Sequence, residues 1–171
     1  VATVATGLSC DTLRNWDVNG GIYSTSLNGT SGWGYLPGHG VWDAYGDGSL
    51  MIQQQQMFEM YNSPSTAEVR RVRVPISVAE DVSGTGVVAF IIYDDLAGSP
   101  NTQLAVEYVN ISDLYAGSWN EIDFATPASV TGDFWVSMFF DYGTTQDTVA
   151  IFDADTRTGG NDGYLIYDGT S

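Results

Sequence analysis

Acidic and amide side chains gather in two Gly-rich segments at spacings typical of calcium loops. "DADTRTGGNDG" places four of them within ten residues near the C-terminal end, and "VWDAYGDG" supplies two more. The candidate ligands are Asp153, Asp155, Asn161, Asp162, Asp43 and Asp47. Calcium takes oxygen ligands from loops, so these residues predict a structural calcium. The alternative is that Asp and Asn form turns here by bonding their own backbone.

A second set of side chains has the chemistry of a carbohydrate site. Aromatic rings can stack on the apolar faces of sugars, while amide and guanidinium groups can bond their hydroxyls. The candidates are Trp33, Tyr35, Trp42, Trp119, Gln53, Gln55, Arg71 and Arg73. The first three lie in Gly-rich loops and Trp119 starts a strand in "AGSWNE". The alternative is that the rings pack loops onto a sheet, so we expect only one or two of them to bind a ligand.

The four consecutive glutamines in "GDGSLMIQQQQMFEMY" require a structural explanation of their own. The apolar, β-prone residues on both sides predict a strand over 50–61. Neither face of that strand is wholly apolar, which predicts a bulge or a change of environment midway. One glutamine pair is expected on a sheet face beside Arg71 and Arg73. The other is expected to be buried and bonded to backbone or water, because an unpaired buried polar group costs about 1–3 kcal/mol.

Catalytic patterns are weak. A glycosidase needs two carboxylates about 5–10 Å apart, and no spacing marks such a pair. Glu59 and Glu107, on apolar strands, are the carboxylates most expected to be desolvated. Cys10 and His39 are the single cysteine and histidine, and no G-x-S-x-G elbow is present. The sequence therefore predicts a protein without catalytic activity, with a small glycan hydrolase or lyase as one alternative.

Charge limits the partners. The chain has no lysine, five arginines and 21 acidic residues, giving a formal net charge of -16. Such a surface repels nucleic-acid phosphates and anionic membranes. No apolar run is long enough to span a bilayer, so neither nucleic-acid binding nor membrane insertion is expected.

The elements that must position these residues are strands. Apolar residues recur at period two between clusters of turn-forming residues. The expected strands span 50–61, 68–78, 86–95, 103–111, 119–125, 132–143, 147–155 and 163–169. In 119–125, Ile122 and Phe124 should face inward, opposite to Glu121 and Asp123. The 171 residues fit one domain, and the pattern predicts a single antiparallel, jelly-roll-like β-sandwich over 1–171.

Residues 50–155 resemble the β-sandwich accessory modules of proteins exported by the type IX secretion route. The resemblance rests on the Gly98-Ser99-Pro100 turn after a strand ending in Tyr-Asp, the strand from Gly132 to Val136, and the Asp147-Thr148-Val149 strand start. "CDTL" at 10–13 is a further similarity. The resemblance implies a module of a larger secreted or cell-surface protein, covalently joined to neighbouring domains. It implies no catalytic residues.

The sequence thus predicts a non-catalytic accessory module that binds a polysaccharide and is stabilised by calcium. The main alternative is a structural or adhesive spacer module with calcium sites and no glycan binding.

Overall fold

The computed structural model describes residues 56–139 and 147–151 with their side chains, and further strand segments as backbone only. The strands are β1 (Ala2–Thr6), β2 (Ser9–Leu13), β3 (Ile22–Tyr23), β4 (Trp33–Leu36), β5 (Gly40–Trp42), β6 (Gln56–Glu80), β7 (Val87–Asp95), β8 (Pro100–Asn110), β9 (Ser118–Phe140), β10 (Thr148–Ile151), β11 (Asp153–Ala154) and β12 (Tyr164–Tyr167). Among the described residues the one helical segment is the single turn η1 (Ile111–Asp113). No helix in this part of the chain is long and apolar enough to cross a membrane. The prediction of an all-β, antiparallel protein is confirmed.

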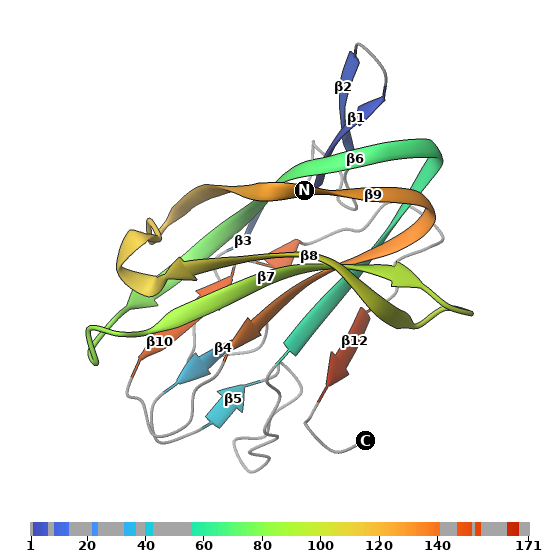
Figure 1. Cartoon of the computed structure of the whole chain (residues 1–171). Coiled ribbons are helices and arrows are strands. Elements are labelled where there is room, and N and C mark those ends of the chain that lie inside the picture. The colour runs from blue at the N-terminus through green and yellow to red at the C-terminus, as the bar shows by residue number, and fades with distance from the viewer. Residues whose placement is uncertain are drawn as a thin grey trace.

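Ten of the described strands join in one sheet, and β3 with β11 form a separate pair. The main path runs β5-β4-β10-β6-β9-β7-β8, with β1 and β12 also paired to β6. Every described pairing is antiparallel. β6 and β9 form the centre of this sheet, and β7 and β8 continue it on one side (Figure 1).

The two long strands bend together. Their pairing runs from Gln56↔Phe139 to Ile76↔Ser118, with register shifts at Ser63/Ala67 and Val69/Arg71. Figure 1 shows both ribbons turning sharply in the same place, at the right of the view. Gly132 of β9 pairs with Ser63 beside the first of these register shifts, and its φ of 76° favours glycine. The sequence predicted two separate strands in the place of each long strand. The predicted strands 50–61 and 68–78 are parts of β6, which begins at Gln56 in the described structure. The predicted strands 119–125 and 132–143 are parts of β9, which ends at Phe140.

The bend divides the β6–β9 pair into two parts. We call residues 56–63 and 132–139 the buried half, and residues 67–76 and 118–130 the open half. In the buried half, successive residues Phe134 and Trp135 point to opposite faces, yet both are almost fully buried, at 0% and 1% exposure. In the open half only one face is buried, through residues such as Ile122 and Phe124, while Glu121 and Asp123 are exposed. The predicted alternation of 119–125 is confirmed.

One apolar cluster holds the sheet together. It includes Val69, Ile76, Ile122 and Phe124 from the open half, and Tyr61, Phe134 and Met138 from the buried half. β7 adds Val88, Phe90 and Ile92, and β10 adds Val149 and Ile151. The prediction of a buried central strand at 86–95 is confirmed, because β7 lies between β9 and β8 and is buried from Val88 to Ile92.

A polar junction fixes the start of β10 to the loop that precedes β7. The buried carboxylate of Asp147 accepts hydrogen bonds from the Ser83 amide and the Ser83 hydroxyl, both at 2.7 Å. Gly86 fits beside it so closely that a Cβ would lie 2.6 Å from Ile111 Cδ1 and 2.7 Å from Asp147 Oδ2. The Gly86 carbonyl in turn accepts the Ile111 amide at 2.8 Å, which holds η1 at the end of β8.

A tight turn joins β7 to β8. Leu96 and Ser99 exchange backbone hydrogen bonds around Ala97 and Gly98, which have φ of 57° and 84°. Positive φ at both central residues is the geometry of a type I′ hairpin turn. Asp95 accepts from the Gly98 amide at 3.0 Å and from Trp135 Nε1 at 2.8 Å, so it ties this turn to the buried half.

Candidate functional site

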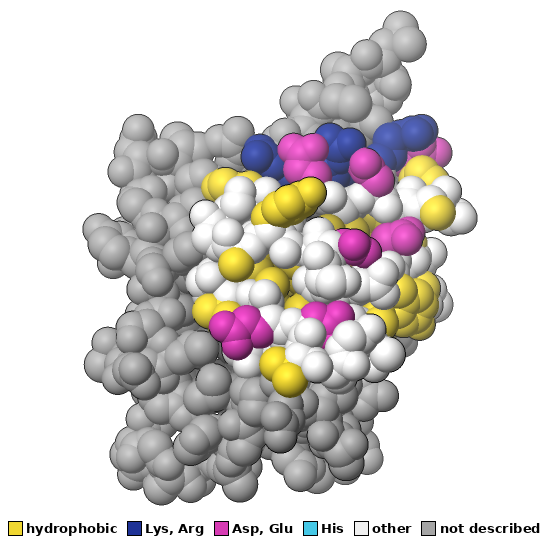
Figure 2. Space-filling model, turned by 90° about the vertical axis from the view of Figure 1, so that its left-hand side faces the viewer, with side chains coloured by type: hydrophobic (Ala, Val, Ile, Leu, Met, Phe, Trp, Pro, Cys, Tyr) yellow, Lys and Arg dark blue, Asp and Glu magenta, His cyan; other side chains and the backbone are white. Residues whose placement is uncertain are grey.

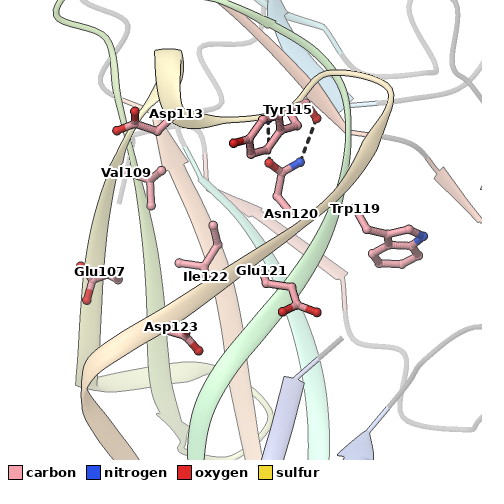
Figure 3. Close-up of a pocket in the computed structure, with 9 residues that line it drawn as sticks. All are labelled: Glu107, Val109, Asp113, Tyr115, Trp119, Asn120, Glu121, Ile122 and Asp123. Carbon is pink, nitrogen blue, oxygen red and sulfur yellow. Dashed lines mark hydrogen bonds between the residues drawn. The ribbon is translucent and has the colours of Figure 1, made fainter.

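A groove lies between β8 and the open half of β9. Within the described residues β8 pairs with β7 alone, so its other edge faces the first part of β9 without a backbone ladder. The groove has a volume of about 450 Å³, within the range of about 300–1,000 Å³ typical of ligand pockets. Its lining residues are Glu107, Val109, Asp113, Tyr115, Trp119, Asn120, Glu121, Ile122 and Asp123 (Figure 3). We call this the β8–β9 groove.

The upper end of the β8–β9 groove is a loop held by Asn120. Asn120 is buried, and its Oδ1 accepts the Tyr115 amide at 2.7 Å. Its Nδ2 donates to the carbonyls of Tyr115 at 3.0 Å and Ser118 at 3.2 Å. Figure 3 shows the two bonds between Asn120 and Tyr115 bridging the turn. The backbone of Tyr115 is therefore fixed while its ring stays 74% exposed.

The β9 wall of the groove carries an ion-pair network. Arg71, opposite Asp123 on β6, donates from Nε to Asp123 Oδ1 at 2.5 Å and from Nη2 to Asp123 Oδ2 at 2.8 Å. Its Nη1 donates to Glu121 Oε2 at 2.7 Å. These hydrogen bonds from Arg71 lower the pKa of Asp123 and raise the pKa of Arg71 itself. Arg73 adds an ion pair with Glu121 at 3.2 Å.

Trp119 lies at the edge of this network. The Arg73 guanidinium carbon lies 5.4 Å from the centre of the Trp119 ring, a cation–π distance. In Figure 3 the indole extends away from Asp113 and Val109, on the opposite side of the view. Trp119 therefore forms a rim of the β8–β9 groove.

Figure 2 shows how charge is distributed on one face of the molecule. Arginine and acidic side chains alternate in one band at the top of that view, where β6 and β9 run. The arginines with described side chains are Arg70, Arg71 and Arg73, all on β6. Acidic side chains also lie below the band, with no basic side chain coloured among them.

The β8 wall has a different electrostatic character. Glu107 Oε2 accepts the backbone amide of Ala125 at 3.0 Å. Asp113 Oδ2 accepts the side-chain amide of Asn110 at 2.8 Å. Both donors are neutral, so the described contacts leave the negative charge of these two carboxylates uncompensated.

The glutamine tract enters the described structure at Gln56. Its Nε2 donates to Ser137 Oγ at 2.8 Å and to Tyr93 Oη at 3.2 Å, and its side chain is buried. Gln56 is therefore buried, as expected for one pair of the tract. Its described partners are side chains of β9 and β7, whereas backbone or water was expected. Gln53 and Gln55 lie outside the described residues.

Three predicted carbohydrate-binding residues come together at the groove: Trp119, Arg71 and Arg73. The donors of Arg71 are directed at carboxylates, so its contribution is to orient Glu121 and Asp123. Trp33 and Tyr35 belong to β4 and Trp42 belongs to β5. For these three residues the structure describes the backbone alone. The same holds for Asp153 in β11. The remaining calcium candidates, Asp155, Asn161, Asp162, Asp43 and Asp47, lie outside the described residues.

The described part of the chain contains no group of three or more His, Cys, Asp or Glu side chains arranged to hold a metal ion. Glu59 and Glu107 are far apart. Glu59 lies on β6 and Glu107 on β8, and β9 and β7 lie between these two strands in the sheet. Three strand spacings, about 14 Å, therefore separate β6 from β8. That exceeds the separation a glycosidase pair requires.

Sequence reasoning did not single out Tyr115, Asp113 or Asn120. The sequence signal for this end of the groove was "DLYAGSWN", which places an aromatic residue in a short Gly-containing turn between two strands. Such turns run over the surface, so an aromatic side chain there indicates a binding residue. In comparisons with family models, with curated proteins and with solved structures, nothing matches this chain.

Proposed function

We propose that this protein is a carbohydrate-binding module that holds its glycan in the β8–β9 groove. The observation that carries the proposal is the exposed Tyr115 ring, whose backbone is held by buried Asn120 at the mouth of a groove with polar walls. An aromatic side chain has only two torsions to immobilise on binding and offers a flat surface to the apolar face of a sugar.

The other lining groups suit the rest of a sugar. Carboxylates accept hydrogen bonds from hydroxyls, and Arg71 holds two of them, Glu121 and Asp123, in place. Val109 and the buried Ile122 supply apolar contact. Trp119, stacked with Arg73 at the rim, offers a second ring to a longer chain.

We also infer that the bent sheet is a jelly-roll-like β-sandwich and that the module belongs to a secreted or cell-surface protein. The sandwich is supported by the shared core, to which both halves of the β6–β9 pair contribute. Export is supported by the resemblance of 50–155 to accessory modules. A structural calcium, with ligands among Asp153, Asp155, Asn161, Asp162, Asp43 and Asp47, completes the proposal.

Affinity electrophoresis on a panel of polysaccharides tests the binding function. At least one polymer should retard the protein, and Tyr115→Ala should weaken that binding about tenfold, equivalent to about 1.4 kcal/mol. Tyr108→Ala is the matched control, because Tyr108 is 68% exposed on β8 but does not line the groove. Absence of retardation by every polymer would favour the spacer function, and turnover of a polymer would favour a hydrolase or lyase.

Thermal melting with and without a chelator tests calcium separately. The melting temperature should fall when calcium is removed, because a ligand that binds only the native state stabilises it. An unchanged melting temperature would eliminate calcium without affecting the glycan proposal.

A further inference from the structure

We propose that the β8–β9 groove selects glycans that carry free amino groups, and disfavours those that carry carboxylates. This inference rests on the proposed function and specifies its ligand. It follows from the way charge is compensated on the two walls of the groove.

On the β9 wall, negative charge is already matched within the protein. Arg71 binds Glu121 and Asp123, and Arg73 approaches Glu121 at 3.2 Å. A cationic ligand gains little there, because two guanidinium groups already lie beside these two carboxylates.

On the β8 wall the charges of Glu107 and Asp113 are unmatched. Their described donors are a backbone amide and a side-chain amide. Each carboxylate can accept further hydrogen bonds, and an ammonium group provides both donors and the opposite charge. Among the described residues that line the groove none is basic, so none of these side chains offers an anionic sugar a salt bridge.

The mouth of the groove adds a second contact suited to an ammonium group. Tyr115 follows Asp113 by two residues, and both side chains are exposed at the end of the groove beside η1. In Figure 3 the Tyr115 ring is directed toward the β8 side, where Asp113 lies. A cation between a carboxylate and an aromatic face is attracted by both. An amino sugar supplies this cation together with an apolar ring face.

The net charge of -16 acts in the same direction over a longer range. It raises the local concentration of a polycation and lowers that of a polyuronate, to a degree that falls with ionic strength. This general attraction must be separated from recognition by the groove itself.

The test compares three oligosaccharides of equal length by titration calorimetry: a glucosamine oligomer, the N-acetylglucosamine oligomer and a galacturonic acid oligomer. The titrations are run at about pH 5.5, at which the amines of the glucosamine oligomer are protonated. The glucosamine oligomer should bind about tenfold more tightly than its N-acetylated counterpart, and the uronic acid oligomer most weakly.

Two neutral variants assign this preference to the groove. Glu107→Gln and Asp113→Asn keep an oxygen that can accept the present hydrogen bonds, so they remove charge with little change of shape. Together they should reduce the preference for the amine to less than about twofold. Glu80→Gln is the charge control, since it removes one exposed carboxylate outside the groove and should leave the preference unchanged. Thermal melting of each variant verifies folding.

The outcomes separate the two proposals. Equal binding of the amine and N-acetyl oligomers would overturn the amine preference while leaving glycan binding intact. Tighter binding of the uronic acid oligomer would also overturn it. An oligolysine peptide that binds as tightly as the glucosamine oligomer, with the same loss in the double variant, would show that the groove recognises cations without regard to sugar. Absence of binding by all three oligosaccharides would overturn the amine preference, whereas the glycan-binding function is decided by the polysaccharide panel.

Discussion

The two halves of the β6–β9 pair are built from the same two strands but have opposite surroundings. In the buried half both faces are covered around Phe134 and Trp135. Two of its buried polar side chains, Gln56 and Ser137, bond one another, and Gln56 also bonds Tyr93. In the open half one face packs into the core and the other carries Arg71, Glu121, Asp123 and Trp119. A strand pair that bends can thus stabilise the fold with one part and present ligand-binding groups with the other.

The difference also shows which polar groups serve the structure. Polar atoms in the buried half need partners because water cannot reach them, whereas charged groups in the open half are partly solvated. Removing a side chain should therefore reduce stability in the buried half and binding in the open half. Four experiments test this contrast, in order of decreasing expected effect.

The largest contrast is between two tryptophans. Trp135→Ala should reduce the free energy of unfolding by about 3–5 kcal/mol, because it leaves a large cavity in the buried half and removes the donor to Asp95. Trp119→Ala should reduce it by less than about 1 kcal/mol, as expected for a partly exposed surface side chain, while weakening glycan binding. Urea unfolding of both variants checks this. Equal losses of stability would contradict the division into two halves.

The second variant tests the buried polar contacts. Gln56→Met should cost about 1–3 kcal/mol, because it leaves Ser137 Oγ buried without its Gln56 donor. Adding Ser137→Ala should cost little more, since the polar group that lost its partner is then also removed. A double-mutant cycle measures this coupling, and additive losses would show that the hydrogen bond contributes nothing.

The third variant tests the bend that separates the halves. Gly132→Ala should destabilise the protein by about 1–2 kcal/mol, because a φ of 76° is costly for alanine. No atom lies within 4 Å of the new Cβ, so the loss would arise from the backbone conformation. Gly132→Asn should cost less, since asparagine tolerates positive φ better. If alanine is tolerated as well as asparagine in thermal melts, Gly132 does not set the bend.

The smallest effect concerns the ion pairs of the open half. Arg71 lowers the pKa of Asp123, so this pair stabilises the native state above the carboxyl's unfolded pKa, and the contribution is lost as pH falls through its lower native pKa. Arg71→Gln should return the pKa of Asp123 toward its ordinary value. It should change the free energy of unfolding by less than the variants at Trp135, Gln56 and Gly132 do. NMR titration of the Asp123 carboxyl measures this shift, and an unchanged pKa would contradict the assigned role of Arg71.

Sequence reasoning succeeded where the chain follows simple alternation. It placed Ile122 and Phe124 inward and Glu121 and Asp123 outward, and it predicted the strand that the structure shows as β7. It did not foresee that β6 continues through Pro64 and Ser65, because proline and serine between two runs are typical of a turn. For Trp135 the alternation left open a core position or an exposed sheet face, and both faces of its strand proved to be buried.

The site was only partly predictable. Trp119, Arg71 and Arg73 were identified from residue type, but their mutual contacts depend on the register of β6 with β9, which a single sequence does not determine. Asn120 looks like an ordinary turn residue, and its role depends on its burial beneath the loop of Tyr115. Glu107 and Asp113 reach the groove because β8 diverges from β9, a tertiary feature that no local pattern records.

NMR mapping of the glucosamine oligomer on the labelled protein tests the central claim most directly. If the open half presents the binding site, amide shift changes should concentrate in residues 107–123 and on Arg71 and Arg73, and be small over 56–63 and 132–139. Changes centred on the buried half, or absent from 107–123 while the oligomer binds, would contradict a site in the β8–β9 groove.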